Sequence, residues 1–140
     1  MNPIFDTTRI GTIGELLVQL RLFEYGVQAA PPLKDSGNDF IAVNGHTFRS
    51  ISVKTTEKKT YEKPANRLYH VLAVVKLVIE DGVLLDSSSI WLMTPDDVQQ
   101  ASPSCSRLRR EHLISVARVE ELFGPPAAES REVPVQGLVL

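Results

Sequence analysis

The stretch that decides the fold is Asn38–Thr56, which reads NDFIAVNGHTFRSISVKTT. It contains two strand-like runs, DFIAV and TFRSISVK, with the dipeptide Asn44-Gly45 between them. Asn-Gly between two such runs is a strong signal for a tight hairpin turn of the primed type. The sequence therefore predicts an antiparallel β-hairpin at this point of the chain.

The second strand of this hairpin has one polar face. Because successive strand side chains point to opposite faces, Ser50, Ser52 and Lys54 share a face of the sheet. Asp39 opens the first strand, and pairing about the turn places Asp39 and Lys54 near the same end of the hairpin. This face is either an ordinary solvated surface or the lining of a cleft.

The segment before the hairpin predicts a helix over residues 6–26, DTTRIGTIGELLVQLRLFEYG, ending at Gly26. The apolar residues of this helix form one stripe at helical spacing, namely Ile13, Leu16, Leu17, Leu20 and Phe23. Val18 and Leu22 widen the apolar surface toward the other side. A polar notch remains, formed by Thr12, Glu15 and Gln19.

The segments after the hairpin predict further strands and short helices. LYHVLAVVKLVI is typical of a buried central strand, and SIWLMT is a second strand candidate. Pro95 opens a short helix, and a last helix, SVARVEELFG, ends at Gly124. This order favours an α/β protein in which helices cover a mixed sheet.

Composition excludes several classes of protein. The chain has 140 residues, 43% of them hydrophobic, and a net charge of -2, so no overall charge draws it to nucleic acid or anionic membranes. The single cysteine, Cys105, permits no internal disulfide and favours a reducing, cytoplasmic compartment. We find no signal peptide and no apolar run of the roughly 20 residues that a membrane span needs, so no membrane association is expected.

Three segments in this order resemble a known superfamily. GTIGELLVQLRLFEYG, SGNDFIAV and ISVKTT are similar to the PD-(D/E)XK nucleases, which have a restriction-endonuclease-like fold and include Mrr-type enzymes and Holliday-junction resolvases. The resemblance covers about the first 60 residues. It implies a three-layer α/β arrangement with a mixed central β-sheet flanked by helices. We expect a single domain over residues 1–124 and a peripheral tail over 125–140.

The resemblance also implies a site. Glu15 matches the helix glutamate, Asp39 the metal-binding aspartate and Lys54 the motif lysine, so Glu15 and Asp39 would hold Mg²⁺ and Lys54 would serve the attacking water. Ser52 stands where the family has a second acid, and a neutral hydroxyl is the poorer metal ligand. Glu57 or Asp35 could supply a displaced carboxylate.

The loop after the hairpin is basic. It contributes four residues that would contact phosphates if the protein binds nucleic acid, namely Lys58, Lys59, Lys63 and Arg67. Arg107, Arg109 and Arg110 form a second basic group. The ordinary interpretation of both groups is a solvated loop.

Two functions of different classes follow. The first is a Mg²⁺-dependent nuclease-like protein that hydrolyses phosphodiester bonds in DNA or RNA. The second is a catalytically degenerate module of the same fold that binds or assembles without nuclease activity, with Ser52 recording the loss of the acid; a homodimer formed through the last strand would fit it. A partner protein without any nucleic-acid contact is a third alternative.

Overall fold

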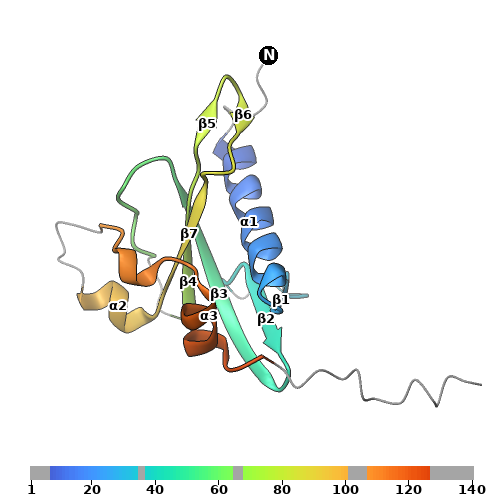
Figure 1. The fold of residues 1–140 in the computed structure, drawn as a ribbon. Helices are drawn as coiled ribbons and strands as arrows, with labels where there is room; N and C mark the ends of the chain where they lie inside the picture. The colour runs from blue at the N-terminus through green and yellow to red at the C-terminus, as the bar shows by residue number, and fades with distance from the viewer. Residues whose placement is uncertain (1–6, 35–36, 65–67, 101–106, 127–140) are drawn as a thin grey trace, which may run out of the picture.

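The centre of the molecule is a five-stranded sheet in the order β1-β2-β3-β4-β7 (Figure 1). The computed structural model describes residues 7–34, 37–64, 68–100 and 107–126. β3 and β4 are parallel, and the other neighbouring pairs are antiparallel. The predicted mixed sheet is therefore confirmed. Its strands are β1 (Gln28–Ala30), β2 (Phe40–Asn44), β3 (Thr47–Thr56), β4 (Val71–Lys76) and β7 (Ser89–Met93).

The predicted hairpin joins β2 to β3. Asn44 pairs with Thr47 and Phe40 pairs with Ile51, so the loop consists of two residues. Its first residue, Gly45, has φ +61°, which L side chains rarely adopt. A primed turn of this kind matches the twist of the two strands and fixes their register.

Helices cover both faces of the sheet, which gives three layers. α1 (Thr7–Glu24) and α3 (Val116–Phe123) contribute to a core on one face, and α2 (Pro95–Gln100) packs on the other face with Tyr61 and Tyr69. Figure 1 shows α1 and α2 on opposite sides of the strands. β4 is buried over Val71–Val75 because it lies between both layers. The expected central strand is confirmed.

Smaller elements complete the described chain. A hairpin of β5 (Ile79–Glu80) and β6 (Val83–Leu84) extends from the sheet, and a 3₁₀ turn, η2 (Arg110–His112), precedes α3. None of the helices within the described ranges is long and apolar enough to cross a membrane. Residues 127–140, most of the expected tail, lie outside the described residues, so the division at residue 124 stays a prediction.

The apolar stripe of α1 does not coincide with its buried face. Leu16, Leu20 and Phe23 are 58%, 53% and 64% exposed, whereas Val18 and Leu22 are completely buried. The helix carries apolar residues around most of its circumference, so periodicity alone did not tell which of them face the sheet. The tertiary contacts of α1 with the sheet made that choice.

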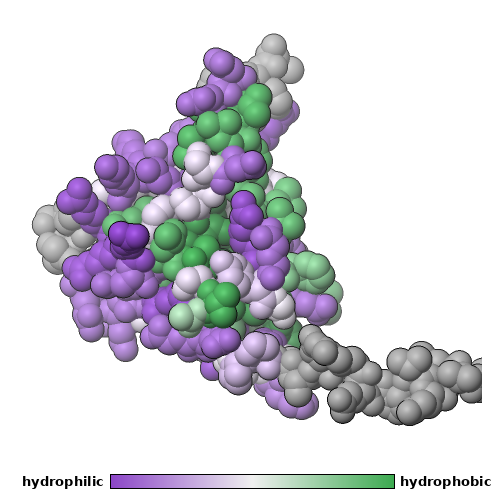
Figure 2. Space-filling view, viewed as in Figure 1, coloured by the Kyte–Doolittle hydropathy of each residue, from purple (hydrophilic) through white to green (hydrophobic). Residues whose placement is uncertain are grey.

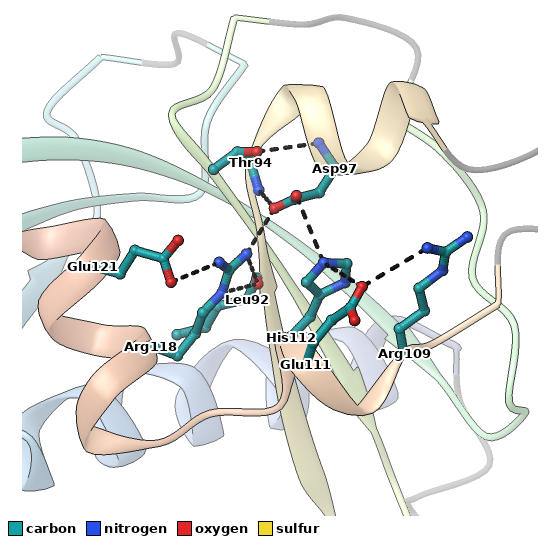
Figure 3. Close-up of polar contacts among 8 residues, drawn as sticks. All are labelled: Leu92, Thr94, Asp97, Arg109, Glu111, His112, Arg118 and Glu121. Carbon is teal, nitrogen blue, oxygen red and sulfur yellow. Dashed lines mark hydrogen bonds and ion pairs between the residues drawn. The ribbon is translucent and has the colours of Figure 1, made fainter.

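An ion-pair network ties α2 and α3 to the edge strand β7 (Figure 3). Arg118 donates from Nε and Nη2 to Leu92 O at 3.0 and 2.9 Å, and Nη2 also donates to Asp97 Oδ2 at 2.7 Å. Thr94 and Asp97 bond to each other's backbone N–H at the start of α2. His112 Nε2 lies 3.6 Å from Asp97 Oδ1. One aspartate thus links three segments that are distant in sequence.

Gly14 is the point of closest approach between α1 and the sheet. A Cβ at this position would overlap Thr55 Oγ1, whereas a Cβ at Gly11 would meet no atom within 4 Å. The packing of α1 against the sheet therefore requires a glycine at position 14 but not at position 11.

This contrast predicts opposite effects of the same substitution. Gly11→Ala should raise the free energy of unfolding by up to about 1 kcal/mol, because alanine favours the helix. Gly14→Ala should lower it by about 1–3 kcal/mol, because α1 must move away from β3. Urea denaturation of the two variants measures both changes. Equal effects at the two positions would contradict the close packing at Gly14.

Candidate active site at the start of β2

Asp39 lies directly before β2, where β3 continues beyond the residues that pair with β2. The Asp39 backbone N–H donates to Ile51 O at 2.9 Å, and its Oδ2 accepts from Val53 N at 2.7 Å. β3 continues through Thr56, paired there with β4. The Asp39 carboxylate therefore takes the place of a β2 partner for Val53. This bond fixes the carboxylate beside the backbone that leads to Lys54.

Glu15 approaches Asp39 from α1. Burial raises the pKa of the Glu15 carboxyl above 4.5, and the negative charge of Asp39 and a side-chain hydrogen bond with Asp39 raise it further. Two carboxylates that share a hydrogen bond repel each other when both are ionised. The structure thus brings together the two acids that the resemblance assigned to metal binding.

Lys54 lies on the face of the sheet that is opposite to α1. Val53 packs with the core beneath α1, and side chains alternate along a strand, so Lys54 points away from α1. It is partly exposed. Among the described residues its side chain has neither an ion-pair nor a hydrogen-bond partner. Glu15 and Lys54 therefore lie on opposite faces of the sheet, and only the bond between Asp39 and the neighbouring Val53 N–H links Asp39 to this part of β3.

Ser52 is buried, although the sequence placed it on a solvated face or in a cleft. It is only 9% exposed, and it lies next to Val53, to which Asp39 is bonded. A buried neutral hydroxyl gives little to a hydrated cation, which prefers charged oxygen ligands and its own waters. Ser52 therefore fills the acid position without offering the acid's charge. The alternative carboxylate Glu57 is exposed on the loop after β3, and Asp35 lies outside the described residues.

A histidine near this region was not anticipated. His70 precedes β4, and its Nδ1 accepts from the Ser50 backbone N–H at 2.9 Å and lies 3.0 Å from Ser50 Oγ. Because the backbone N–H can only donate, the neutral ring carries its proton on Nε2. Asn38 Nδ2 also donates to Leu68 O at 3.2 Å. Only the parallel pairing of β3 with β4 brings these residues together, so no local pattern could identify them.

The raised pKa of Glu15 has a consequence for stability. The folded protein holds the Glu15 proton more tightly than the unfolded chain does. The resulting stabilisation is complete below the ordinary pKa and is lost as the pH rises through the folded-state pKa. Above the folded-state pKa this stabilisation is absent, because burial and the negative charge of Asp39 oppose the ionised form of Glu15.

Glu15→Gln should remove this repulsion. We expect the free energy of unfolding to rise by about 0.5 kcal/mol at pH 7, a small gain because the side chain is partly solvated. The gain should disappear below the ordinary pKa of 4.5. Urea denaturation at neutral and at acidic pH measures the difference, and Glu57→Gln serves as an exposed control. A gain that is the same at both pH values would contradict the coupling to Asp39.

The acid pair fits a divalent cation. Mg²⁺ in proteins is often held by one or two carboxylates together with water and substrate phosphate, and a cation between Glu15 and Asp39 would relieve their repulsion. No group of three or more metal-ligating side chains occurs among residues 7–34, 37–64, 68–100 and 107–126. The site can therefore supply two charged ligands, and the remaining ligands would be water or substrate.

The two basic segments, far apart in sequence, meet beyond the end of β3. Thr60 forms a β-bridge with Arg107, and the Leu108 N–H donates to Lys59 O at 3.1 Å. The exposed cations of this basic rim are Lys58, Lys59, Arg107, Arg109 and Arg110. Figure 2 shows mostly hydrophilic residues on the left of the molecule, where these segments lie.

The two remaining residues that were expected to contact nucleic acid are Lys63 and Arg67. Lys63 is partly buried and has an interaction partner. Arg67 lies outside the described residues, as does Cys105. The expected phosphate contacts of all four loop residues stay predictions.

Comparison with known proteins gives one likeness of fold. No family model and no curated protein match the chain. The solved structure of a bacterial homing endonuclease, I-Ssp6803I, is similar with a TM-score of 0.54 and 14% sequence identity, over 92% of this chain and 99% of that one. At this identity the likeness concerns the fold alone. The chain thus has a five-stranded mixed α/β architecture of the kind found in a nuclease.

Proposed function

We propose that the protein is a Mg²⁺-dependent nuclease-like enzyme that hydrolyses phosphodiester bonds in DNA or RNA. The observation that carries the proposal is the coupling of Glu15 to Asp39, whose carboxylate accepts from the N–H of Val53, the residue before Lys54. Paired acids and a lysine are the residue types that metal-assisted phosphodiester hydrolysis needs. The likeness to a homing endonuclease supports the proposal at the level of the fold.

Each residue has a role in this proposal. Asp39 and Glu15 hold the cation, and the Val53 N–H keeps the Asp39 carboxylate in place. The bound metal would polarise the phosphate and lower the pKa of a water molecule. Lys54 orients the attacking water and stabilises the charge that develops on the phosphate. The basic rim binds neighbouring phosphates, which would make affinity dependent on salt.

One observation favours a second candidate, a binding module of the same fold without catalysis. Ser52 is neutral and buried, so a site of this design has one carboxylate fewer than the superfamily pattern. Such a module would keep the basic rim and bind nucleic acid without cutting it.

A cleavage assay separates the two candidates. Purified protein is incubated with plasmid DNA, branched DNA, single-stranded DNA and structured RNA, in Mg²⁺, in Mn²⁺ and in EDTA. The enzyme cleaves at least one substrate only in the presence of metal. The binding module retards substrates in gel-shift assays, more weakly as salt rises, and cleaves none of them. Absence of both cleavage and binding would contradict both candidates.

A further inference from the structure

The exposed apolar side of α1 forms a groove with the edge strand β1. Leu16, Leu20 and Phe23 repeat at helical spacing and remain more than half exposed. The groove has a volume of about 490 Å³, and the remaining lining residues are Gln19 and the strand 28–30. Figure 2 shows hydrophobic residues reaching the surface on the right of the molecule, where Figure 1 places α1. Exposed apolar residues grouped in this way indicate a covered surface.

The chemistry of the groove limits what can cover it. No lining residue is charged, so phosphates and acidic or basic partners find no ion pair there. Gln19 Nε2 already donates to Ala29 O at 3.0 Å, which satisfies the central carbonyl of the strand β1. The groove is therefore suited to apolar side chains in an uncharged segment, more than to an added strand held by backbone hydrogen bonds.

The chain itself leaves the described structure beside this groove. Asn44 Nδ2 donates to the carbonyl oxygens of Phe123, Gly124 and Pro125, at 2.9, 3.2 and 2.9 Å. The residue before Asn44, Val43, pairs with Gln28 of the groove. Pro126 lines a second hollow, of about 230 Å³, together with Glu24 and Tyr25, the residues that directly follow Phe23 in α1.

Residues 133–140, VPVQGLVL, have the side-chain composition that the groove requires. None of their side chains is charged, and five of them are valine or leucine. An extended segment of the length of 127–140 spans about 45 Å, whereas Leu16 to Phe23 spans about 10 Å of helix. The segment is therefore long enough to reach from Pro126 along the whole groove.

We propose that residues 133–140 cover the groove of their own chain and place their valine and leucine side chains against Leu16, Leu20 and Phe23. This intramolecular cover explains an apolar groove and an apolar segment that would otherwise both face water. The proposal does not depend on nuclease activity.

Disulfide cross-linking in the full-length protein tests the proposal. In a Cys105→Ser background, Leu20→Cys is combined with Leu138→Cys, and the protein is oxidised at low concentration. The matched control combines Leu138→Cys with Val83→Cys, because Val83 is 60% exposed on the β5–β6 hairpin, away from the groove. Docking should give an intramolecular cross-link in at least about tenfold higher yield than the control, through the higher effective concentration.

Intact-mass analysis and a non-reducing gel distinguish the outcomes. A monomeric cross-linked product that exceeds the control supports the proposal. Cross-linked dimers as the main product would overturn it in favour of a tail that reaches a second copy. Yields equal to the control would overturn it as well. Leu138→Glu in the full-length chain should then raise the binding of an apolar fluorescent dye, while Val83→Glu should not.

Discussion

Replacing Asp39 with asparagine should reduce metal-dependent cleavage by about 10²–10³-fold. The variant removes one negative charge from the acid pair and keeps a side-chain oxygen that can accept from the Val53 N–H, so the local backbone arrangement should persist. The expected loss therefore reports on the charge and not on the fold. Cleavage rates at saturating Mg²⁺ measure it, and unchanged thermal unfolding of the metal-free variant verifies that the protein is folded.

Metal binding provides a second measurement on the same variant. Calorimetric titration with Mg²⁺ or Mn²⁺ should give binding to the wild-type protein and none to Asp39→Asn. Because the pKa of Glu15 is raised, binding at mildly acidic pH should also release a proton, which appears as a heat that depends on the buffer.

Lys54→Met separates binding from chemistry. Lys54 is not assigned a metal contact, so this variant should keep its metal affinity and lose cleavage. Exposed Asp81 lies on the distant β5–β6 hairpin, and Asp81→Asn should change neither property. Cleavage that persists in Asp39→Asn would place the active site elsewhere, whereas metal binding without cleavage in the wild type would support the binding module.

Replacing Arg118 with methionine should lower the free energy of unfolding by about 3 kcal/mol. Arg118 is 7% exposed, and it bonds both Leu92 O and the Asp97 carboxylate. Methionine fills much of the same volume but leaves the carbonyl and the carboxylate without their donor. Loss of one member of a buried pair is costly because the remaining charge stays desolvated. Thermal unfolding should shift downward by about 10 °C.

Arg109→Met is the matched control. Arg109 lies 3.8 Å from Glu111 and both side chains are mostly exposed. Removing such a pair should change stability by no more than about 0.5 kcal/mol. Equal effects of the two arginine substitutions would contradict the role of Arg118 in joining α2 and α3 to β7.

The pKa of Asp97 predicts how the difference in stability between the wild type and Arg118→Met depends on pH. Burial alone would raise the pKa of Asp97, but hydrogen bonds from Thr94 and Arg118, together with nearby His112, outweigh burial and hold it below 3.8. The stabilisation by ionised Asp97 is therefore present above pH 3.8 and is lost as the pH falls through the lower folded-state pKa. The difference in the free energy of unfolding between the wild type and Arg118→Met should therefore become smaller at strongly acidic pH.

Local patterns were enough to predict the four strands β2, β3, β4 and β7, but not the short strand β1 or which strands are neighbours in the sheet. The Asn44-Gly45 signal predicted the hairpin, whereas the structure set the register, with Gly45 and His46 as the two-residue loop and Asn44 paired with Thr47. The apolar run of β4 gave a central strand, since a strand covered on both faces needs no polar alternation. Gly26 and Gly124, at φ +84° and +86°, mark the ends of α1 and α3.

Residue spacing about the turn predicted that Asp39 and Lys54 lie near the same end of the hairpin, and the resemblance assigned Glu15 to the same site. The roles of these residues stay predictions. That Glu15 reaches Asp39 is a result of how α1 crosses β3, which depends on Gly14 lying against Thr55.

Only the tertiary structure decided which face of α1 is buried, how the two basic segments join, and that Arg118 and Asp97 form a buried pair. Each of these depends on contacts between residues far apart in the chain, and no periodicity in the sequence records such contacts. The sequence by itself determined the strands, the turns and the chemical types available at the site. The packing of the layers determined which of those side chains meet, because burial is a property of the assembled sheet and helices.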